Sequence, residues 1–287
     1  MRTWLAPYEM IRARSLDEAL QRLADDPGKW TPFAGGTDLM VLLESGKLNA
    51  TRYLDLWSIA ELRGMREETS MLQIGALTTY TDLLESPVVR AEFPLICEAA
   101  RETGAIAIQN RGTIGGNIAN ASPAADLPPA LLVYDAALEI RSTRGHRVVK
   151  YVDFHKGYKV MDLAADELIT AITLPRGRSE WKQSYRKVGT RRAQAISKVC
   201  FAAAAEVSGG VIRDIRIALG SVAPTVVRCL STEESLRTRR LTPEVISAAR
   251  TQIDRDISPI DDIRSNERYR RLVAANLLEQ FLVGGSR

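Results

Sequence analysis

GTIGGNIANASPAADLPPALL, from Gly112 to Leu132, separates an alanine-rich helical run from an apolar run. Its three glycines and two asparagines indicate backbone that another group approaches closely, because turn formers without bulk leave room beside the chain. The successive amides of Gly115 and Gly116 can form a concave nest for an anion such as a phosphate. A shorter version, PFAGGTDLM, runs from Pro32 to Met40.

Neither glycine segment matches a standard nucleotide or acyl-transfer signature. GxxxxGK[ST], GxGxxG and GxSxG are all absent from the sequence. A lone Gly-Gly pair is usually only a turn. Two such pairs, each followed closely by Asp or Asn, instead favour loops that bind the two halves of a pyrophosphate through neutral amides.

Length and charge restrict the class of protein. The chain has 287 residues, which predicts two or three subdomains. Its net charge of +4 comes from 39 basic and 35 acidic residues, too mild and too mixed a balance to indicate nucleic acid. No apolar run is long enough for a membrane span, and the N-terminus lacks the apolar region of a signal peptide. We therefore expect a cytoplasmic protein.

The cysteines and histidines do not suggest a metal site. Cys97, Cys200 and Cys229 are far apart, with no CxxC pair. His146 and His155 do not form an HExxH motif. We therefore expect no disulfide framework, zinc site or iron–sulfur cluster on this chain.

Hydrophobic periodicity predicts mixed helices and strands before Arg176. Ser15 and Glu18 form a capping box that starts a helix ending near Pro27. Further helices are expected to begin at Thr79 or Thr81 and to cover 92–105. Strands are expected at TPF before the first Gly-Gly, at 53–57, at 71–77 and at 166–175, and the stretch 129–142 is expected to contain a strand or a strand pair.

The pattern changes after Arg176, where a polar, charged stretch suggests a domain boundary. Three strands are predicted at 183–188, 196–207 and 211–222, with Gly209-Gly210 as the hairpin turn between the last two. Two helices, 241–257 and 266–283, are expected to close the chain.

AGGTDL (34–39) and TIGGNIANASPAADLPPALL (113–132) together resemble the FAD-binding medium subunit of molybdenum hydroxylases. That family includes the flavin subunit of xanthine dehydrogenase and the medium subunit of carbon monoxide dehydrogenase. The resemblance continues through LDLWSIAELRGM, LQIGALTTYTDL, DELITAITLP, YRKVGTRRAQAISKV, GSVAPTVVRC and DIRSNERYRR. It therefore covers nearly the whole chain.

The resemblance implies an α+β fold. A vanillyl-alcohol-oxidase (PCMH)-type FAD-binding domain of two α/β subdomains would span 1–176, divided at about 1–56 and 57–176. A C-terminal domain of small antiparallel sheet plus helices would span 177–287.

The resemblance also assigns cofactor-binding residues. The first pyrophosphate loop would be Thr31, Pro32, Phe33, Ala34, Gly35, Gly36, Thr37 and Asp38. The second would be Gly112, Thr113, Ile114, Gly115, Gly116 and Asn117. Asp126 would accept hydrogen bonds from the flavin side, Ile169 would pack against the flavin, and Lys187 would lie near the ring. The structural alternatives are that Asp126 caps a helix, Ile169 is only core, and Lys187 is only solvated.

The family scheme gives this chain FAD and no catalytic acid, base, nucleophile or metal ligand. A large partner subunit would carry the molybdenum cofactor, and a small one would carry the [2Fe–2S] clusters. The assembly would be a dimer of heterotrimers. Electrons would pass from the clusters through FAD to NAD⁺, O₂ or a quinone-linked carrier.

Two other functions remain open from the sequence. One is a free-standing flavin oxidase or dehydrogenase of the same fold superfamily, although no His or Cys for covalent flavin lies near either loop. The other is a scaffold that binds partners and no flavin. Valine at Gly115 or Gly116 is expected to abolish FAD retention while leaving the fold intact.

Overall fold

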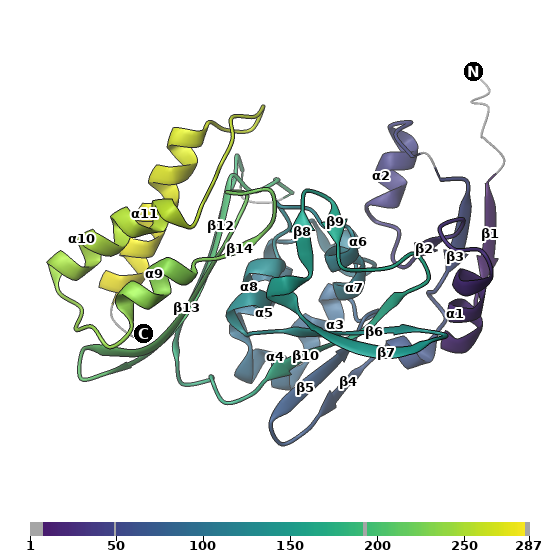
Figure 1. Ribbon diagram of the computed structural model, residues 1–287, viewed down its shortest axis with the longest axis horizontal. Coiled ribbons are helices and arrows are strands. Elements are labelled where there is room, and N and C mark those ends of the chain that lie inside the picture. The colour runs from purple at the N-terminus through teal and green to yellow at the C-terminus, as the bar shows by residue number, and fades with distance from the viewer. Residues whose placement is uncertain (1–7, 49, 192–193, 285–287) are drawn as a thin grey trace.

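The computed structural model describes residues 8–48, 50–191 and 194–284. Among the described residues, three sheets of three or more strands follow one another along the chain, a two-stranded hairpin accompanies the second, and helices separate or cover them. Figure 1 shows the sheet of β1, β2 and β3 at one end of the molecule and helices α9, α10 and α11 at the other. The helices from α3 to α8 lie between these ends.

The first sheet is parallel, in the order β1-β3-β2. Its strands are β1 (Glu9–Arg12), β2 (Thr31–Phe33) and β3 (Arg52–Asp55). Helix α1 (Leu16–Asp25) connects β1 to β2, and Ser15 caps it by accepting the Glu18 N–H, as predicted. The short helix α2 (Leu39–Glu44) follows β2. The carboxyl ends of β2 and β3 therefore meet at one edge.

The second sheet has the order β4-β5-β10-β6-β7, with every neighbouring pair antiparallel. Its strands are β4 (Met65–Glu67), β5 (Met71–Gly75), β6 (Ala137–Ser142), β7 (Gly145–Lys150) and β10 (Leu168–Pro175). The helices of this region are α3 (Tyr80–Glu85), α4 (Pro87–Glu92), α5 (Pro94–Glu102), α6 (Ile106–Gln109), α7 (Ile114–Ala119) and α8 (Pro128–Val133). The hairpin β8 (His155–Gly157) and β9 (Val160–Met161) stands apart from the sheet. Helices and sheet share one apolar core.

The prediction of a strand within 129–142 is confirmed, and the alternative of a strand pair is not. Residues Pro128–Val133 form helix α8, and only Ala137–Ser142 is a strand. Every residue of α8 is buried, so the helix has no polar face and its sequence shows no helical period. Prolines at the first helical positions are compatible with the helix, because those N–H groups need no intrahelical acceptor.

The third sheet is antiparallel, in the order β11-β12-β13-β14, and follows the three-strand prediction closely. Its strands are β11 (Lys182–Val188), β12 (Val199–Ser208), β13 (Val211–Gly220) and β14 (Val227–Arg228). Gly209 and Gly210 make the β12–β13 turn, both with positive φ, as the hairpin signal predicted.

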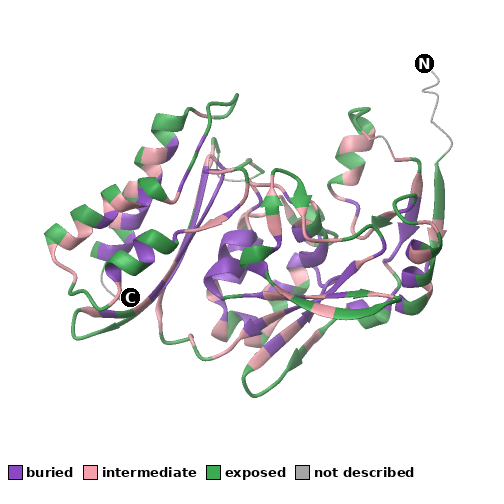
Figure 2. Cartoon of the chain, viewed as in Figure 1, coloured by how far each residue is buried: buried purple, intermediate pink, exposed green. Residues whose placement is uncertain are grey.

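Strand β12 is buried on both faces over its first half, as Figure 2 shows for this sheet. Cys200 and Ala202 belong to the core shared with the central helices, whereas Val199 and Phe201 belong to the core beneath the C-terminal helices. Successive side chains of a strand point to opposite faces. The uninterrupted apolar run of this strand therefore reflects a sheet covered on both sides.

The closing helices α10 (Pro243–Gln252) and α11 (Glu267–Val283) lie within the predicted ranges. Helix α9 (Leu230–Leu236) was not expected, because its polar residues give no clear apolar face. The predicted α+β fold, with antiparallel sheet and helices at the C-terminal end, is confirmed. In the described part of the chain, no helix has the length and apolar character needed to cross a membrane.

Candidate functional site

The first glycine segment leaves its backbone donors free. Ala34–Asp38 leads from β2 into α2, and Gly36 has a φ of +73°, which suits glycine. The N–H groups of Gly35, Gly36, Thr37 and Asp38 donate to no acceptor within the described residues. Successive unused amides of this kind can bind the oxygens of an anion.

The second glycine segment uses its amides internally. Gly112–Asn117 forms the start of α7, with Thr113 as the N-cap residue. Four successive N–H groups donate as follows: Ile114 to Thr78 O at 3.0 Å, Gly115 to Ala76 O at 2.9 Å, Gly116 to Thr113 Oγ1 at 3.1 Å, and Asn117 to Thr113 O at 2.9 Å. The expectation that Gly115 and Gly116 present an open nest of amides is therefore wrong.

The glycine at 115 instead permits close packing. A Cβ atom there would lie 2.7 Å from Ala76 Cβ and 2.8 Å from Ala76 O. A Cβ at Gly116, which is exposed, would lie 2.8 Å from Thr113 Oγ1. A valine at Gly115 would therefore displace α7 from the end of β5, contrary to the expectation that it leaves the fold intact.

The two glycine segments touch each other. A Cβ atom at Gly35 would lie 1.7 Å from the carbonyl oxygen of Arg111, the residue immediately before Gly112. A Cβ at Gly116 would lie 3.9 Å from Ala34 Cβ. The structure thus brings together the two stretches that the sequence singled out, through backbone contact that only glycine allows.

Asp126 and Lys187 form a buried ion pair. Lys187 Nζ lies 2.7 Å from Asp126 Oδ2 and also donates to Glu102 O at 2.7 Å. The Lys187 side chain is 5% exposed and the Asp126 side chain is 12% exposed. Lys187 is therefore not a solvated cation. Asp126 does not cap α8, whose N-cap position is Leu127.

The second carboxylate oxygen of Asp126 has no partner. Oδ1 is buried and accepts no hydrogen bond in the described part of the chain. Burial raises the pKa of Asp126 to about 6, although Lys187 opposes this rise. Tyr185 O–H donates to the Asp126 carbonyl at 2.9 Å and fixes its backbone. A buried acceptor without a donor is costly, so Oδ1 is suited to accept from a ligand.

Ile169 lies in β10, is 7% exposed and belongs to the central core. The strand has a bulge between Ile169 and Ala171. The intervening Thr170 O accepts the Ala76 N–H at 3.0 Å, and Ala76 is also the residue that holds Gly115. Ile169 is thus a core residue, and its neighbour Thr170 is linked to the second segment through Ala76. The contact of Ile169 with flavin stays a prediction.

Tyr80 was missed by the sequence analysis. A Cβ at Gly112 would lie 2.8 Å from Tyr80 Cε2. Burial, assisted by the charge of Asp126, raises the pKa of Tyr80. The tyrosine therefore packs beneath the second segment and near the buried ion pair. Its place in an ordinary helix-start pattern gave no signal of this role.

Lys159 was also missed. It lies in the β8–β9 turn with a φ of +58° and donates from Nζ to Asn120 Oδ1 at 2.7 Å and to Asn120 O. Burial lowers the pKa of Lys159, and the nearby Asp38 carboxylate opposes this. The turn therefore places a cation near the ends of both glycine segments. This arrangement depends on tertiary contacts and has no local sequence signal.

These groups fit FAD chemically. The unused amides of the first segment suit a pyrophosphate, and the unpartnered Asp126 Oδ1 suits an N–H or O–H donor of the cofactor. Asn117 Oδ1 is another buried acceptor without a partner among the described residues. The described residues contain no group of three or more His, Cys, Asp or Glu side chains that could hold a metal ion.

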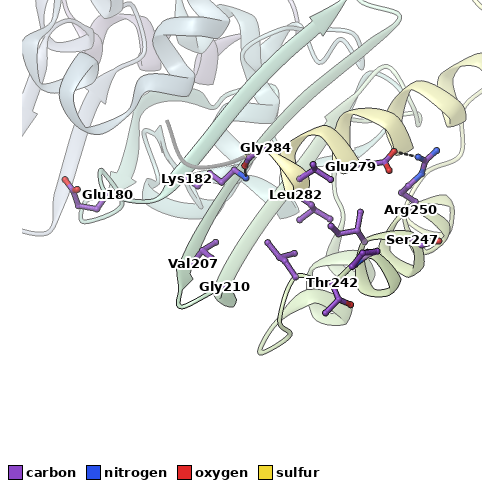
Figure 3. Close-up of a pocket in the computed structure, with 14 residues that line it drawn as sticks. Glu180, Lys182, Val207, Gly210, Thr242, Ser247, Arg250, Glu279, Leu282 and Gly284 are labelled. Atoms are coloured by element: carbon purple, nitrogen blue, oxygen red, sulfur yellow. Dashed lines mark hydrogen bonds and ion pairs between the residues drawn. The ribbon is translucent and has the colours of Figure 1, made fainter.

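A separate groove of about 870 Å³ lies in the C-terminal part of the molecule (Figure 3). It is lined by residues of β11, the β12–β13 hairpin, α10 and α11. Its cations are already paired: Arg250 with Glu279 and Lys182 with the Gly284 carbonyl. Because the donors of Gly35–Asp38 are unused, the glycine segments are a better candidate for a ligand site than this groove.

Two family models match the chain. The model described as "FAD binding domain in molybdopterin dehydrogenase" matches residues 6–177. The model described as "CO dehydrogenase flavoprotein C-terminal domain" matches residues 161–283.

Similar proteins cover almost the whole chain. The glyceraldehyde dehydrogenase medium chain of Sulfolobus acidocaldarius is 34% identical over 93% of this chain and 94% of its own. A putative xanthine dehydrogenase FAD-binding subunit of Escherichia coli is 34% identical over 90% of this chain and 89% of its own. A solved carbon monoxide dehydrogenase structure from Hydrogenophaga pseudoflava contains a chain with a TM-score of 0.93 and 30% identity, covering 97% of this chain and 96% of that one.

Proposed function

The chain belongs to the FAD-binding medium subunits of molybdenum hydroxylases, and we propose that it holds FAD and relays electrons within a multi-subunit oxidoreductase. In this proposal, [2Fe–2S] clusters of a small partner subunit supply the electrons. A large partner subunit carries the molybdenum cofactor and oxidises the substrate. The relatives described as medium chains support the assignment to a complex.

The observation that carries the proposal is the set of unused N–H groups from Gly35 to Asp38. They lie where the backbone of Gly35 touches the residue preceding Gly112. We assign them to the pyrophosphate of FAD, because backbone amides can satisfy its oxygens without side-chain bulk. The second segment contributes shape: its glycines let α7 lie close to β5 and to the first segment.

The Asp126–Lys187 pair is assigned to the flavin ring. Bound FAD supplies electron transfer between one-electron and two-electron partners. Lys187, held by Glu102 O and Asp126, would keep a positive charge near the ring and favour added negative charge there. Asp126 Oδ1 would accept a hydrogen bond from the cofactor and so orient it. Ile169 would add an apolar contact.

The remaining details extend the same proposal. We place the chain in a dimer of heterotrimers in the cytoplasm, with NAD⁺, O₂ or a quinone-linked carrier as the final acceptor. The three cysteines are buried and unpaired, which suits a reducing compartment.

A visible absorption spectrum of the purified full-length chain, before and after addition of FAD, tests the first step. We expect flavin absorbance that stays with the protein through gel filtration. A chain that remains colourless and retains no added FAD would contradict the proposal and support a flavin-free scaffold.

The second step is tested by adding the co-purified large and small subunits with their substrate under anaerobic conditions. We expect the flavin absorbance of this chain to bleach only when the partners are present. Bleaching by small substrates with the chain alone would support a free-standing flavin oxidase instead.

A further inference from the structure

Trp57 lies between two arginines. The guanidinium carbon of Arg63 is 4.2 Å from the centre of the Trp57 ring, and that of Arg111 is 3.7 Å away. Both distances are within the range of cation–π interaction. Two positive charges therefore converge on one indole, at the point where the chain leaves β3.

The two arginines differ in what else they contact. Arg63 donates to Trp57 O at 2.7 Å and to Leu77 O at 3.3 Å, so its position is fixed by backbone carbonyls. Arg111 is an exposed residue, and its guanidinium has neither a hydrogen-bond acceptor nor a carboxylate partner within the described residues. Stacking occupies the face of a guanidinium and leaves its in-plane N–H donors available.

The backbone of Arg111 lies beside the segment that carries the unused amides. Its carbonyl oxygen touches Gly35, as the 1.7 Å distance to a hypothetical Cβ shows. Phe33 and Asp55 are paired neighbours on parallel strands, so the chain after Phe33 and the chain after Asp55 leave the same sheet edge. Gly35 and Trp57 follow these two strand ends. The backbone of Arg111 and the indole that orients its guanidinium therefore both lie next to the chain that carries the donors of the first segment.

We propose that Arg111, oriented by Trp57 and supported by Arg63, binds the pyrophosphate of FAD together with the amides of Gly35–Asp38. This inference rests on the proposed function. The amides supply hydrogen bonds to the phosphate oxygens but no net charge. Arg111 supplies a positive charge and a planar pair of donors, which form strong contacts with phosphate.

A structural role for Arg111 makes a different prediction. If Arg111 only held the region around Trp57 against the second segment, its loss would weaken the binding of every flavin to a similar extent. If it binds the pyrophosphate, its loss would weaken FAD binding and spare riboflavin, which contains no phosphate. The dependence of FAD affinity on salt separates the two roles by a second route, because charge contacts are screened by salt.

The experiment titrates the full-length apoprotein with FAD and riboflavin and follows flavin fluorescence. We expect Arg111→Gln to raise the Kd for FAD about tenfold or more, as for loss of a charged hydrogen bond. Riboflavin affinity should stay within about twofold of wild type on the same argument. Arg111→Lys should lie between the two, since it keeps the charge but loses the planar donors. Arg213→Gln, at an exposed position of β13, is the matched control for loss of one arginine.

The FAD titrations are repeated over a range of NaCl concentrations, and thermal unfolding confirms that each variant folds. We expect the FAD affinity of wild type to fall more steeply with salt than that of Arg111→Gln. An unchanged Kd for FAD in Arg111→Gln, or an unchanged salt slope, overturns the inference while leaving the proposed function intact. Failure of the wild-type chain to bind FAD overturns the proposed function itself.

Discussion

The two glycine segments have nearly the same composition and opposite hydrogen-bonding states. In Ala34–Asp38 the amides from Gly35 onward remain unused within the described chain. In Gly112–Asn117 the amides from Ile114 onward donate to Ala76, Thr78 and Thr113. One segment offers donors to a ligand, and the other uses its donors to hold a helix in place.

The difference shows that a Gly-Gly pair identifies close approach without identifying what approaches. At Gly35 the approaching group is the Arg111 carbonyl, and at Gly115 it is Ala76. The amides remain unused in the first case because no described residue places an acceptor opposite them. They are used in the second case because α7 starts against the chain that leaves β5.

Gly35→Ala should cause the largest loss of FAD binding. The new Cβ would lie 1.7 Å from Arg111 O, so the two segments must separate. Separation would move the Gly35–Asp38 amides away from the pyrophosphate, and loss of about two hydrogen bonds to a charged group predicts a rise in the Kd for FAD of about 100-fold or more. Flavin fluorescence titration measures it.

Gly157→Ala is the control for this change, since its Cβ would have ordinary contact with Val160 at 4.0 Å. Unchanged FAD affinity in Gly35→Ala would show that contact between the segments does not shape the site.

Gly115→Ala should act mainly on stability. Its Cβ would lie 2.7 Å from Ala76 Cβ, and overpacking of this kind costs about 2 kcal/mol. Urea denaturation of the apoprotein measures the free energy of unfolding. Normal stability with complete loss of FAD binding would instead indicate that this glycine serves the cofactor directly, and the contrast between the segments would fail.

Thr113→Ala should have the smallest effect of the three. The variant removes the Oγ1 acceptor of the Gly116 N–H, and loss of an N-cap costs about 1 kcal/mol. Thr37→Ala is the matched control in the first segment, where Thr37 makes no side-chain hydrogen bond to the described residues. Its apoprotein stability should stay within about 0.5 kcal/mol of wild type. Equal losses of apoprotein stability in Thr113→Ala and Thr37→Ala would contradict the different hydrogen bonding of the two segments.

Much of the fold was predictable because its signals are local. The capping box of Ser15 and Glu18 predicts the first helix, and Gly209-Gly210 predicts the β12–β13 hairpin. Helix α8 was not predicted, because complete burial removes the polar face from which a helical period is recognised. Helix α9 was missed because its polar sequence has no clear period.

The candidate site was predictable in outline only. The glycine segments were identified from their composition, and Asp126 and Lys187 through resemblance to a family. The contacts of all of them come from the structure. The ion pair joins Asp126, which precedes β6 in the sequence, to Lys187, which follows β10, and the stack on Trp57 joins the connection 57–63 to Arg111. Contacts between residues this far apart in sequence leave no local pattern.

By itself, the sequence determined the order of most helices and strands, the two positions where backbone must be approached closely, and the family. These follow from periodicity, turn chemistry and motif, which are properties of neighbouring residues. Only the tertiary structure decided which amides remain free and that Asp126 keeps one buried oxygen unpartnered. The physical reason is that a backbone donor is identical at every glycine, and its availability depends on the acceptor that folding places opposite it.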